Sequence, residues 1–228
     1  MERKESPVNQ KRRYDSTRRR LQASQTRMAI LEAARRLFLR DGFTPTTIAA
    51  IAAEVGVSAD TIYKIFRGKP GLVRAICDEA LGGDGPIPAE VRSDALQAEE
   101  RDPRKLIRGW GTLTTEVSPR VSPILLLVRD AAGTDPVMAR LKADLDMQRL
   151  ERMTHNAHNL AAAGHLRPEL SEEAAGEIMW TYSSPELFEL LVLIRGWPLE
   201  RYGAFIAEAM IAALLAPATP NSGGRSRR

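Results

Sequence analysis

The sequence has a single cysteine, Cys77, among its 228 residues, and aromatic residues make up only 5% of it. One cysteine excludes an internal disulfide, so a reducing cytoplasm is the simplest expectation. Long apolar runs are also missing, because ILLLV at 124–128 and LFELLVLI at 187–194 fall well short of the roughly 20 residues of a membrane span. No apolar segment follows the basic N-terminus, so no secretory signal is expected. We predict a cytoplasmic protein without a transmembrane helix.

Catalytic and metal-binding motifs are absent as well. The sequence has no glycine-rich phosphate loop, no nucleophile elbow and no cysteine–histidine pair at a meaningful spacing. His155 and His158 stand at i and i+3, but no cysteine and no third histidine join them at helical spacing, so a polar stripe explains them better than a metal site. Cys77 precedes two acidic residues, which do not activate a thiol, and we interpret it as a packing residue. We expect no cofactor, no metal and no enzymatic activity.

Alanine and leucine are abundant, while β-branched and aromatic residues are sparse, and this composition favours helix over sheet. The hydrophobic fraction of 43% and the chain length are sufficient for a buried core. The sequence therefore predicts an all-α fold.

Charge is distributed unevenly along the chain. Residues 1–80 carry 16 Lys and Arg against 9 Asp and Glu, whereas residues 81–216 carry 14 against 20. A basic front and an acidic body indicate that one end of the protein meets a polyanion. From charge alone, a pair of solvated basic tails remains an equally open interpretation.

The first third of the chain predicts a basic arm followed by four helices. Residues 1–24 are rich in arginine without apolar periodicity, so we expect a disordered arm. A first helix begins near Ser24 or Thr26 and ends at Asp41-Gly42, and shorter helices follow over 47–54, 59–65 and 70–81. The segment GGDGPIP at 82–88 reads as a linker, followed by a polar connector that contains Glu99 and Glu100.

The rest of the chain is also predicted to be helical. We expect helices from Asp102-Pro103 to about Val117, then from the turn at 119–123 to about Ala132, and from Asp135-Pro136 to Gly164. Ser171 caps a further helix, which Pro185 either kinks or restarts, and a last helix spans 198–215. The predicted organisation is an arm at 1–24, a DNA-binding domain at 25–84, an effector-binding and dimerisation domain at 85–216, and a disordered tail at 217–228.

The stretch AAEVGVSADTIYKIFRGK at 52–69 reads as two short helices joined by a tight turn, which is the helix-turn-helix unit. Gly56 suits a turn that needs positive φ, and Ala52 suits a close helix crossing. Small and hydrogen-bonding residues at the start of the second helix can approach base edges in a major groove, and Tyr63, Lys64 and Lys69 can reach phosphates. An ordinary helical hairpin would show the same core positions.

Residues 26–72 resemble the DNA-binding domain of the TetR family of transcriptional regulators. The resemblance rests on Gly42-Phe43, on Thr46-Thr47-Ile48 and on IAAEVGVSADTIYKIFRGKPGL at 51–72. Val55 departs from the alanine that the family often has, and Ile65 departs from a histidine or tyrosine, which removes one phosphate contact. The resemblance implies a three-helix helix-turn-helix domain followed by a helical ligand-binding and dimerisation domain. The DNA-binding residues we predict are Thr46, Thr47, Ser58, Ala59, Asp60, Thr61, Tyr63, Lys64, Phe66 and Lys69.

The resemblance also implies a homodimer, here through helices 171–195 and 198–215, that binds an inverted-repeat operator in double-stranded DNA and is released by a small-molecule effector. The apolar face of these helices independently calls for a partner, although they could instead bury each other within one subunit. Large apolar side chains and one arginine on the expected middle helices are the candidate pocket residues, with plain core packing as the alternative: Trp110, Arg129, Met138, Met153 and Trp180.

Two hypotheses follow. The favoured one is a ligand-responsive repressor that binds a specific operator. The alternative is a helical small-molecule carrier or enzyme without operator specificity, in which the front hairpin is scaffolding. The basic arm either follows the DNA backbone or minor groove, or is solvated without a role.

Overall fold

A computed structural model describes residues 7–83 and 87–217, with side chains from residue 18 onward. Within these residues the secondary structure is helical apart from one isolated bridge between Leu166 and Leu215, which confirms the all-α prediction. No helix in this part of the chain is long and apolar enough to cross a bilayer. The predicted arm at 1–6, part of the linker and the tail from residue 218 lie outside the described residues.

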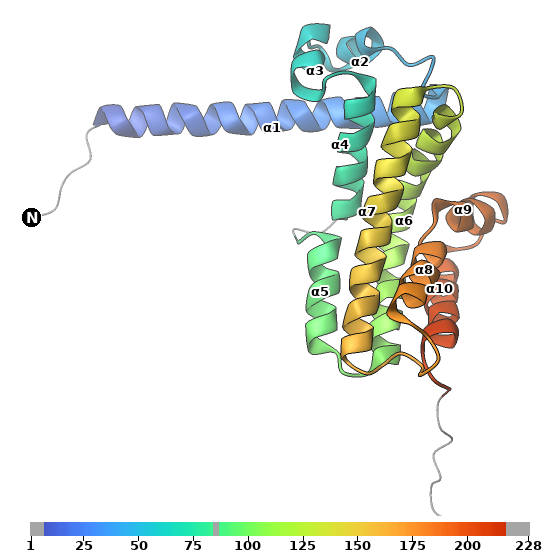
Figure 1. Cartoon of the computed structure of the whole chain (residues 1–228). Coiled ribbons are helices and arrows are strands. Elements are labelled where there is room, and N and C mark those ends of the chain that lie inside the picture. The colour runs from blue at the N-terminus through green and yellow to red at the C-terminus, as the bar shows by residue number, and fades with distance from the viewer. Residues whose placement is uncertain (1–6, 84–86, 218–228) are drawn as a thin grey trace, which may run out of the picture.

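The N-terminal part consists of α1 (Pro7–Asp41), α2 (Ile48–Val55), α3 (Ala59–Phe66) and α4 (Lys69–Gly82). Figure 1 shows α2 and α3 together on one side of α1, with α4 descending from them toward the body. The inner face of each helix contributes to one apolar core, in which Ile30, Phe38, Ile51, Ile62 and Leu72 are fully buried. This core fixes α3 with its opposite face turned to solvent.

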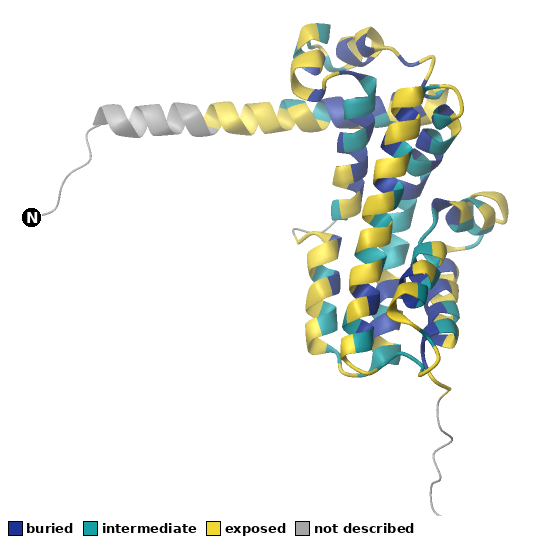
Figure 2. Ribbon diagram, in the orientation of Figure 1, coloured by how far each residue is buried: buried dark blue, intermediate teal, exposed yellow. Residues whose placement is uncertain are grey.

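Helix α1 is longer than the sequence predicts. It begins at Pro7 instead of near Ser24 or Thr26, so residues 7–24, which we expected to be disordered, are helical. Arginine, glutamine and leucine favour helix even where no apolar stripe is present, and proline suits the first helical position. Residues 18–25 are exposed, and the N-terminal half of α1 projects from the molecule as a single rod (Figures 1 and 2).

The C-terminal body contains α5 (Ala89–Glu99), α6 (Pro103–Ala132), α7 (Pro136–Ala162), α8 (Glu172–Tyr182), α9 (Pro185–Phe188), the π-helix η1 (Glu189–Ile194) and α10 (Leu199–Leu214). The long helices α6 and α7 run side by side along the body (Figure 1). Their ends near α1 and α4 complete the N-terminal core, whereas their other ends pack with α8, α9 and α10 in a second core that includes Ile107, Leu160 and Tyr202. Pro185 restarts the chain after Ser184 instead of merely kinking α8.

Two expectations for the body were wrong. The expected turn at 119–123 does not exist, because α6 is one continuous helix with Pro119 and Pro123 inside it. Val121 and Ile124 between and beside these prolines are buried, and tertiary packing therefore outweighs the backbone hydrogen bonds that proline removes. The polar connector beyond residue 88 contains helix α5, which the sequence did not predict.

Helix α5 escapes prediction because polar contacts hold it in place of an apolar stripe. Arg92 donates to both carboxylate oxygens of Glu116 on α6, at 2.9 and 2.5 Å. Asp94 accepts from Arg152 on α7 at 2.6 Å, and Gln97 donates to the amide oxygen of Asn156 at 3.2 Å. A pattern search for apolar periodicity does not detect such a helix.

Candidate DNA-binding surface and effector cavity

The turn between α2 and α3 has the geometry that the sequence predicts. Thr47 caps α2 by accepting from the backbone of Ala50 at 3.1 Å, and Gly56 ends the helix with φ of 73°. Glycine adopts this left-handed conformation at little cost. Ser58 then caps α3 by accepting from the backbone of Thr61 at 3.2 Å. The two short helices are therefore fixed at both ends of the turn.

Helix α3 divides into a buried and an exposed face. Ile62 and Phe66 are buried in the N-terminal core, whereas Tyr63 and Lys64 are exposed. Ser58 and Asp60 are also exposed, and Ala59 and Thr61 are half-buried at the same end of the helix. Figure 2 shows this solvent-facing side at the outer end of the molecule. The surface consists of small and hydrogen-bonding groups at the helix N-terminus with a tyrosine and a lysine one turn further along.

Three predicted DNA-binding residues hold the domain together in this structure. The Thr46 side chain is buried, and its hydroxyl donates to the carbonyl groups of Leu37 and Gly42 at 3.2 and 2.8 Å. Phe66 is 4% exposed and lies against the guanidinium of Arg27, whose central carbon is 4.7 Å from the ring centroid. Neither side chain presents a free group at the outer surface.

Lys69 is the third of these residues. Its ammonium donates to the carbonyl oxygens of Phe43 at 2.6 Å and Thr44 at 3.2 Å, and it lies 4.3 Å from the centroid of the Phe43 ring. Burial lowers the pKa of Lys69, and nearby Asp135 partly opposes this effect. The lysine therefore ties the start of α4 to the loop before α2, with one of its three N–H donors left for other partners.

Sequence reasoning missed Arg67. It ends α3 in the left-handed conformation, with φ of 64°, and its backbone N–H bonds the Tyr63 carbonyl at 2.9 Å. Within residues 7–83 and 87–217 it is the only non-glycine residue with positive φ. Its exposed side chain adds a cation beside Lys64 on the outer surface. The run KIFRGK contained this signal, since a second basic residue follows Lys64 within one turn.

The body encloses a cavity of about 480 Å³ between α5, α6 and α7, with contributions from α4, α8 and α10. One wall, on α6, is mainly apolar and includes Trp110, Leu113, Val117 and Val121. The facing wall, on α7, is more polar. The remaining lining residues are Leu81, Ala89, Glu90, Ser93, Thr114, Ser118, Ser122, Leu125, Leu145, Asp146, Gln148, Arg149, Arg152, Met153, Asn156, Met179, Ser183 and Met210. Its size and amphipathic lining suit a small organic molecule.

The charged groups on the α7 wall are engaged with the protein. Arg149 donates to Asp146 at 3.3 Å, to the Ser183 hydroxyl at 3.2 Å and to the carbonyl of Trp180. Burial lowers the pKa of Arg149, and its hydrogen bond to Asp146 opposes that shift. The hydrogen bond from Arg152 holds the pKa of Asp94 below its ordinary value. The two arginines therefore stay charged beside carboxylates that balance them.

The structure separates the predicted pocket residues. Trp110 and Met153 line the large cavity. Met138 is fully buried in the N-terminal core, and Trp180 lies behind Arg149, whose guanidinium carbon is 4.4 Å from the centroid of its ring. Arg129 lines a separate, much smaller pocket, where it bonds Glu189 at 2.7 Å and lies 3.8 Å from Glu186.

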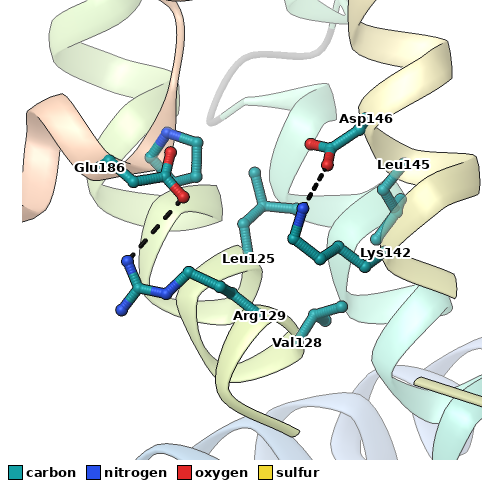
Figure 3. Close-up of a pocket in the computed structure, with 8 residues that line it drawn as sticks. Leu125, Val128, Arg129, Lys142, Leu145, Asp146 and Glu186 are labelled. Carbon is teal, nitrogen blue, oxygen red and sulfur yellow. Dashed lines mark hydrogen bonds and ion pairs between the residues drawn. The ribbon is translucent and has the colours of Figure 1, made fainter. Parts of the chain in front are cut away.

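Figure 3 shows this smaller pocket, with Arg129 directed toward Glu186 on one side and Lys142 paired with Asp146 on the other. Its volume of about 10 Å³ is no more than one water molecule requires. Leu125, Leu145 and Asp146 line both pockets, so the small pocket adjoins one end of the large cavity.

His155 and His158 lie along α7 at its surface. The Nδ1 atom of His158 is 3.1 Å from Glu172, and the Nε2 atom of His155 is 3.2 Å from the Asn159 amide. No group of three metal-binding side chains occurs in the part of the chain that the structure describes. Burial raises the pKa of Cys77 to about 12, as expected for a packing residue.

Comparison with known proteins places this arrangement among regulators. A profile described as "Bacterial regulatory proteins, tetR family" matches residues 30–76. The uncharacterized HTH-type transcriptional regulator YvkB of Bacillus subtilis (strain 168) is 35% identical over 69 residues, which are 30% of this chain and 36% of YvkB. The chain thus spans about a third of the length of YvkB. The HTH-type transcriptional regulator AcrR of Shigella flexneri is 24% identical over 207 residues, which cover 88% of this chain and 94% of AcrR.

The fold agrees with this relationship. SmeT, solved in complex with triclosan and described as the repressor of the Stenotrophomonas maltophilia multidrug efflux pump SmeDEF, superposes with a TM-score of 0.66 at 19% identity. The match covers 90% of this chain and 99% of SmeT. An exposed recognition-type helix on an N-terminal domain, a hollow helical body and a matching profile lead to one conclusion: the chain belongs to the tetR family of bacterial regulatory proteins.

Proposed function

We propose that the protein is a ligand-responsive transcriptional regulator, most simply a repressor, that binds an inverted-repeat operator as a homodimer and is released by a small molecule. Residues 25–84 would form the DNA-binding domain and residues 85–216 the effector and dimerisation domain. The observation that carries the proposal is the exposed face of α3, which is held rigidly by a capped turn on one side and by buried Ile62 and Phe66 on the other.

Within this proposal the residues of α3 have separate roles. Ser58, Ala59, Asp60 and Thr61 stand at the N-terminus of the helix, where side chains approach base edges. The Ser58 and Thr61 hydroxyls are 2.9 Å apart, so each is already oriented by the other before DNA is bound. Tyr63, Lys64 and the exposed Arg67 would contact phosphates, which position the helix without reading sequence. Thr47 would contribute from the start of α2.

The proposed dimer uses the segments 171–195 and 198–215. Large apolar side chains are exposed there, namely Leu190, Leu193, Ile194 and Phe205. A two-fold axis through this surface would place the two α3 helices about 34–36 Å apart, one turn of duplex DNA, and would require a palindromic operator. The cavity between α5, α6 and α7 would hold the effector, and SmeT, with the same fold, has been solved with triclosan bound.

The test of DNA recognition compares one lysine on α3 with one far from it. After an operator is selected from random duplexes at physiological salt, its affinity is measured by fluorescence anisotropy across a salt series. We expect Lys64→Met to weaken binding to all sequences and to reduce the slope of log affinity against log salt by about one unit.

Lys105→Met is the matched control, because Lys105 is also exposed but lies at the far end of the body. Equal losses for the two variants would show that binding follows net charge and not the α3 surface. Failure to enrich any duplex sequence would contradict the proposal and favour a carrier without operator specificity.

A further inference from the structure

The large cavity contains most of the buried polar side chains of the molecule. Within the described residues, the buried polar or charged side chains are Thr46, Ser93, Ser122 and Asn156, and all but Thr46 line this cavity. Burying polar groups in an apolar body is costly unless they are hydrogen-bonded. Their concentration at one cavity indicates a wall built to meet polar atoms of a bound molecule.

Two of the lining side chains have hydrogen-bond donors left over. Trp110 is 7% exposed, and its indole N–H is buried without a hydrogen-bond partner among the described residues. The oxygen of Asn156 accepts from Gln97 at 3.2 Å, while no bond is formed by its amide N–H donors within the same residues. Both groups can donate and neither remaining group can accept, so the missing partner is a hydrogen-bond acceptor.

The charges around the cavity indicate that this acceptor is uncharged. Arg149 and Arg152 are paired with Asp146 and Asp94, at 3.3 and 2.6 Å, so they offer no excess positive charge to an anion. Glu90 makes no ion pair with any described residue, but it is exposed and therefore solvated. An anionic ligand would meet this carboxylate and no free cation, whereas a neutral oxygen avoids the conflict.

The apolar part of the lining indicates the remainder of the ligand. Leu113, Val117 and Val121 cover α6, and Met153, Met179 and Met210 enter from three different helices. Methionine adapts its shape to flat or irregular apolar surfaces and makes favourable contacts with aromatic rings. A cavity of about 480 Å³ accommodates a fused aromatic system of two or three rings.

We propose that the effector is a neutral, largely aromatic molecule carrying an acceptor oxygen, such as a ketone or ether, which receives hydrogen bonds from Trp110 and Asn156. This inference rests on the proposed function, since it names the ligand class of the proposed effector site. It assigns Trp110 and Asn156 as specificity-determining residues and the methionines as the adaptable wall.

The experiment uses four probes with one ring system and the complete chain without DNA. Dissociation constants are measured by equilibrium dialysis for naphthalene, 2-acetylnaphthalene, 2-naphthoate and 2-(aminomethyl)naphthalene. We expect 2-acetylnaphthalene to bind about 2- to 12-fold more tightly than naphthalene, the gain of one net hydrogen bond. The two charged probes should bind more weakly than the ketone.

Trp110→Phe removes the N–H and keeps an aromatic ring, so the ratio of ketone to hydrocarbon affinity should fall toward one. Trp180→Phe is the matched control, because the Trp180 N–H already donates to the Asp146 carbonyl at 3.2 Å and Trp180 does not line the cavity. This control should keep the ratio. Asn156→Asp, which retains the acceptor for Gln97 but loses the amide donors, should also lower it.

Three results would overturn the inference: no saturable binding of 2-acetylnaphthalene, tighter binding of either charged probe, or an unchanged ratio in both Trp110→Phe and Asn156→Asp. Because the measurement contains no DNA, it is independent of the operator test. Ketone selectivity without operator binding would refute the regulator and keep the site, and the reverse outcome would refute the site alone.

Discussion

At the residue scale, the structure gives different roles to side chains that look alike in the sequence. Lys64 and Lys69 are both basic residues after the turn, and both were predicted to contact phosphate. Lys64 is exposed, whereas the ammonium of Lys69 bonds the carbonyls of Phe43 and Thr44. A sequence pattern does not reveal which lysine finds carbonyl partners 25 residues earlier in the chain.

This difference predicts opposite effects on stability. Lys69→Met should lower the free energy of unfolding by about 1–2 kcal/mol, because two carbonyls lose a donor and the Phe43 ring loses its cation. Lys64→Met should change it by less than about 0.5 kcal/mol, as exposed substitutions usually do. Urea unfolding followed by circular dichroism measures both. Equal stability of the two variants would mean that the Lys69 contacts do not form in solution.

At the scale of elements, the closest helix crossing in the body depends on two glycines that the sequence did not single out. A Cβ atom at Gly203 on α10 would lie 2.4 Å from the Thr115 side chain and 2.5 Å from the carbonyl oxygen of Gly111 on α6. At Gly111 it would lie 2.7 Å from the carbonyl oxygen of Gly203. The two helices approach this closely because neither has a side chain at the contact.

Gly203→Ala should therefore lower the free energy of unfolding by about 1–3 kcal/mol through overpacking of α6 against α10. Gly133→Ala is the control, because a Cβ there meets only the Asp130 carbonyl oxygen at 3.8 Å and the residue has helical φ and ψ. That substitution should be neutral or stabilising by about 0.4–1 kcal/mol. Thermal unfolding of the three proteins tests the pair, and a stable Gly203→Ala would show that the helices separate at little cost.

The elements also show what sequence patterns can and cannot predict. Capped helices with an apolar stripe were predicted closely: Thr47, Ser58, Asp135 and Ser171 all cap the expected helices. Helix α5 was missed because its contacts are polar, and α6 was divided because proline usually ends a helix. Of the pocket residues, only Trp110 and Met153 line the cavity, since helical periodicity does not distinguish a hollow interior from a filled one.

At the scale of the whole molecule, the apolar surface of η1 and α10 predicts how subunits associate. Ile194 and Leu193 are 68% and 54% exposed, which is unusual for adjacent large apolar side chains of a soluble monomer. Replacing both with glutamate should weaken the proposed homodimer at least tenfold, because it places charges in an apolar contact.

Sedimentation velocity over a concentration series measures this effect. Met147→Glu is the control, since Met147 is 61% exposed on α7, outside the proposed interface. A dimer that is unaffected by the double replacement would have to form through another surface.

Helix α6 belongs to both cores, with Trp110 at the cavity end and Val128 in the core of the DNA-binding part. Between them, Pro119 and Pro123 each remove one backbone hydrogen bond, and α6 has its lowest bending stiffness there. A load applied at the hollow end would thus be converted into a change of angle at the other end, with both packed ends left intact. The two prolines that fail to interrupt the helix make it a flexure.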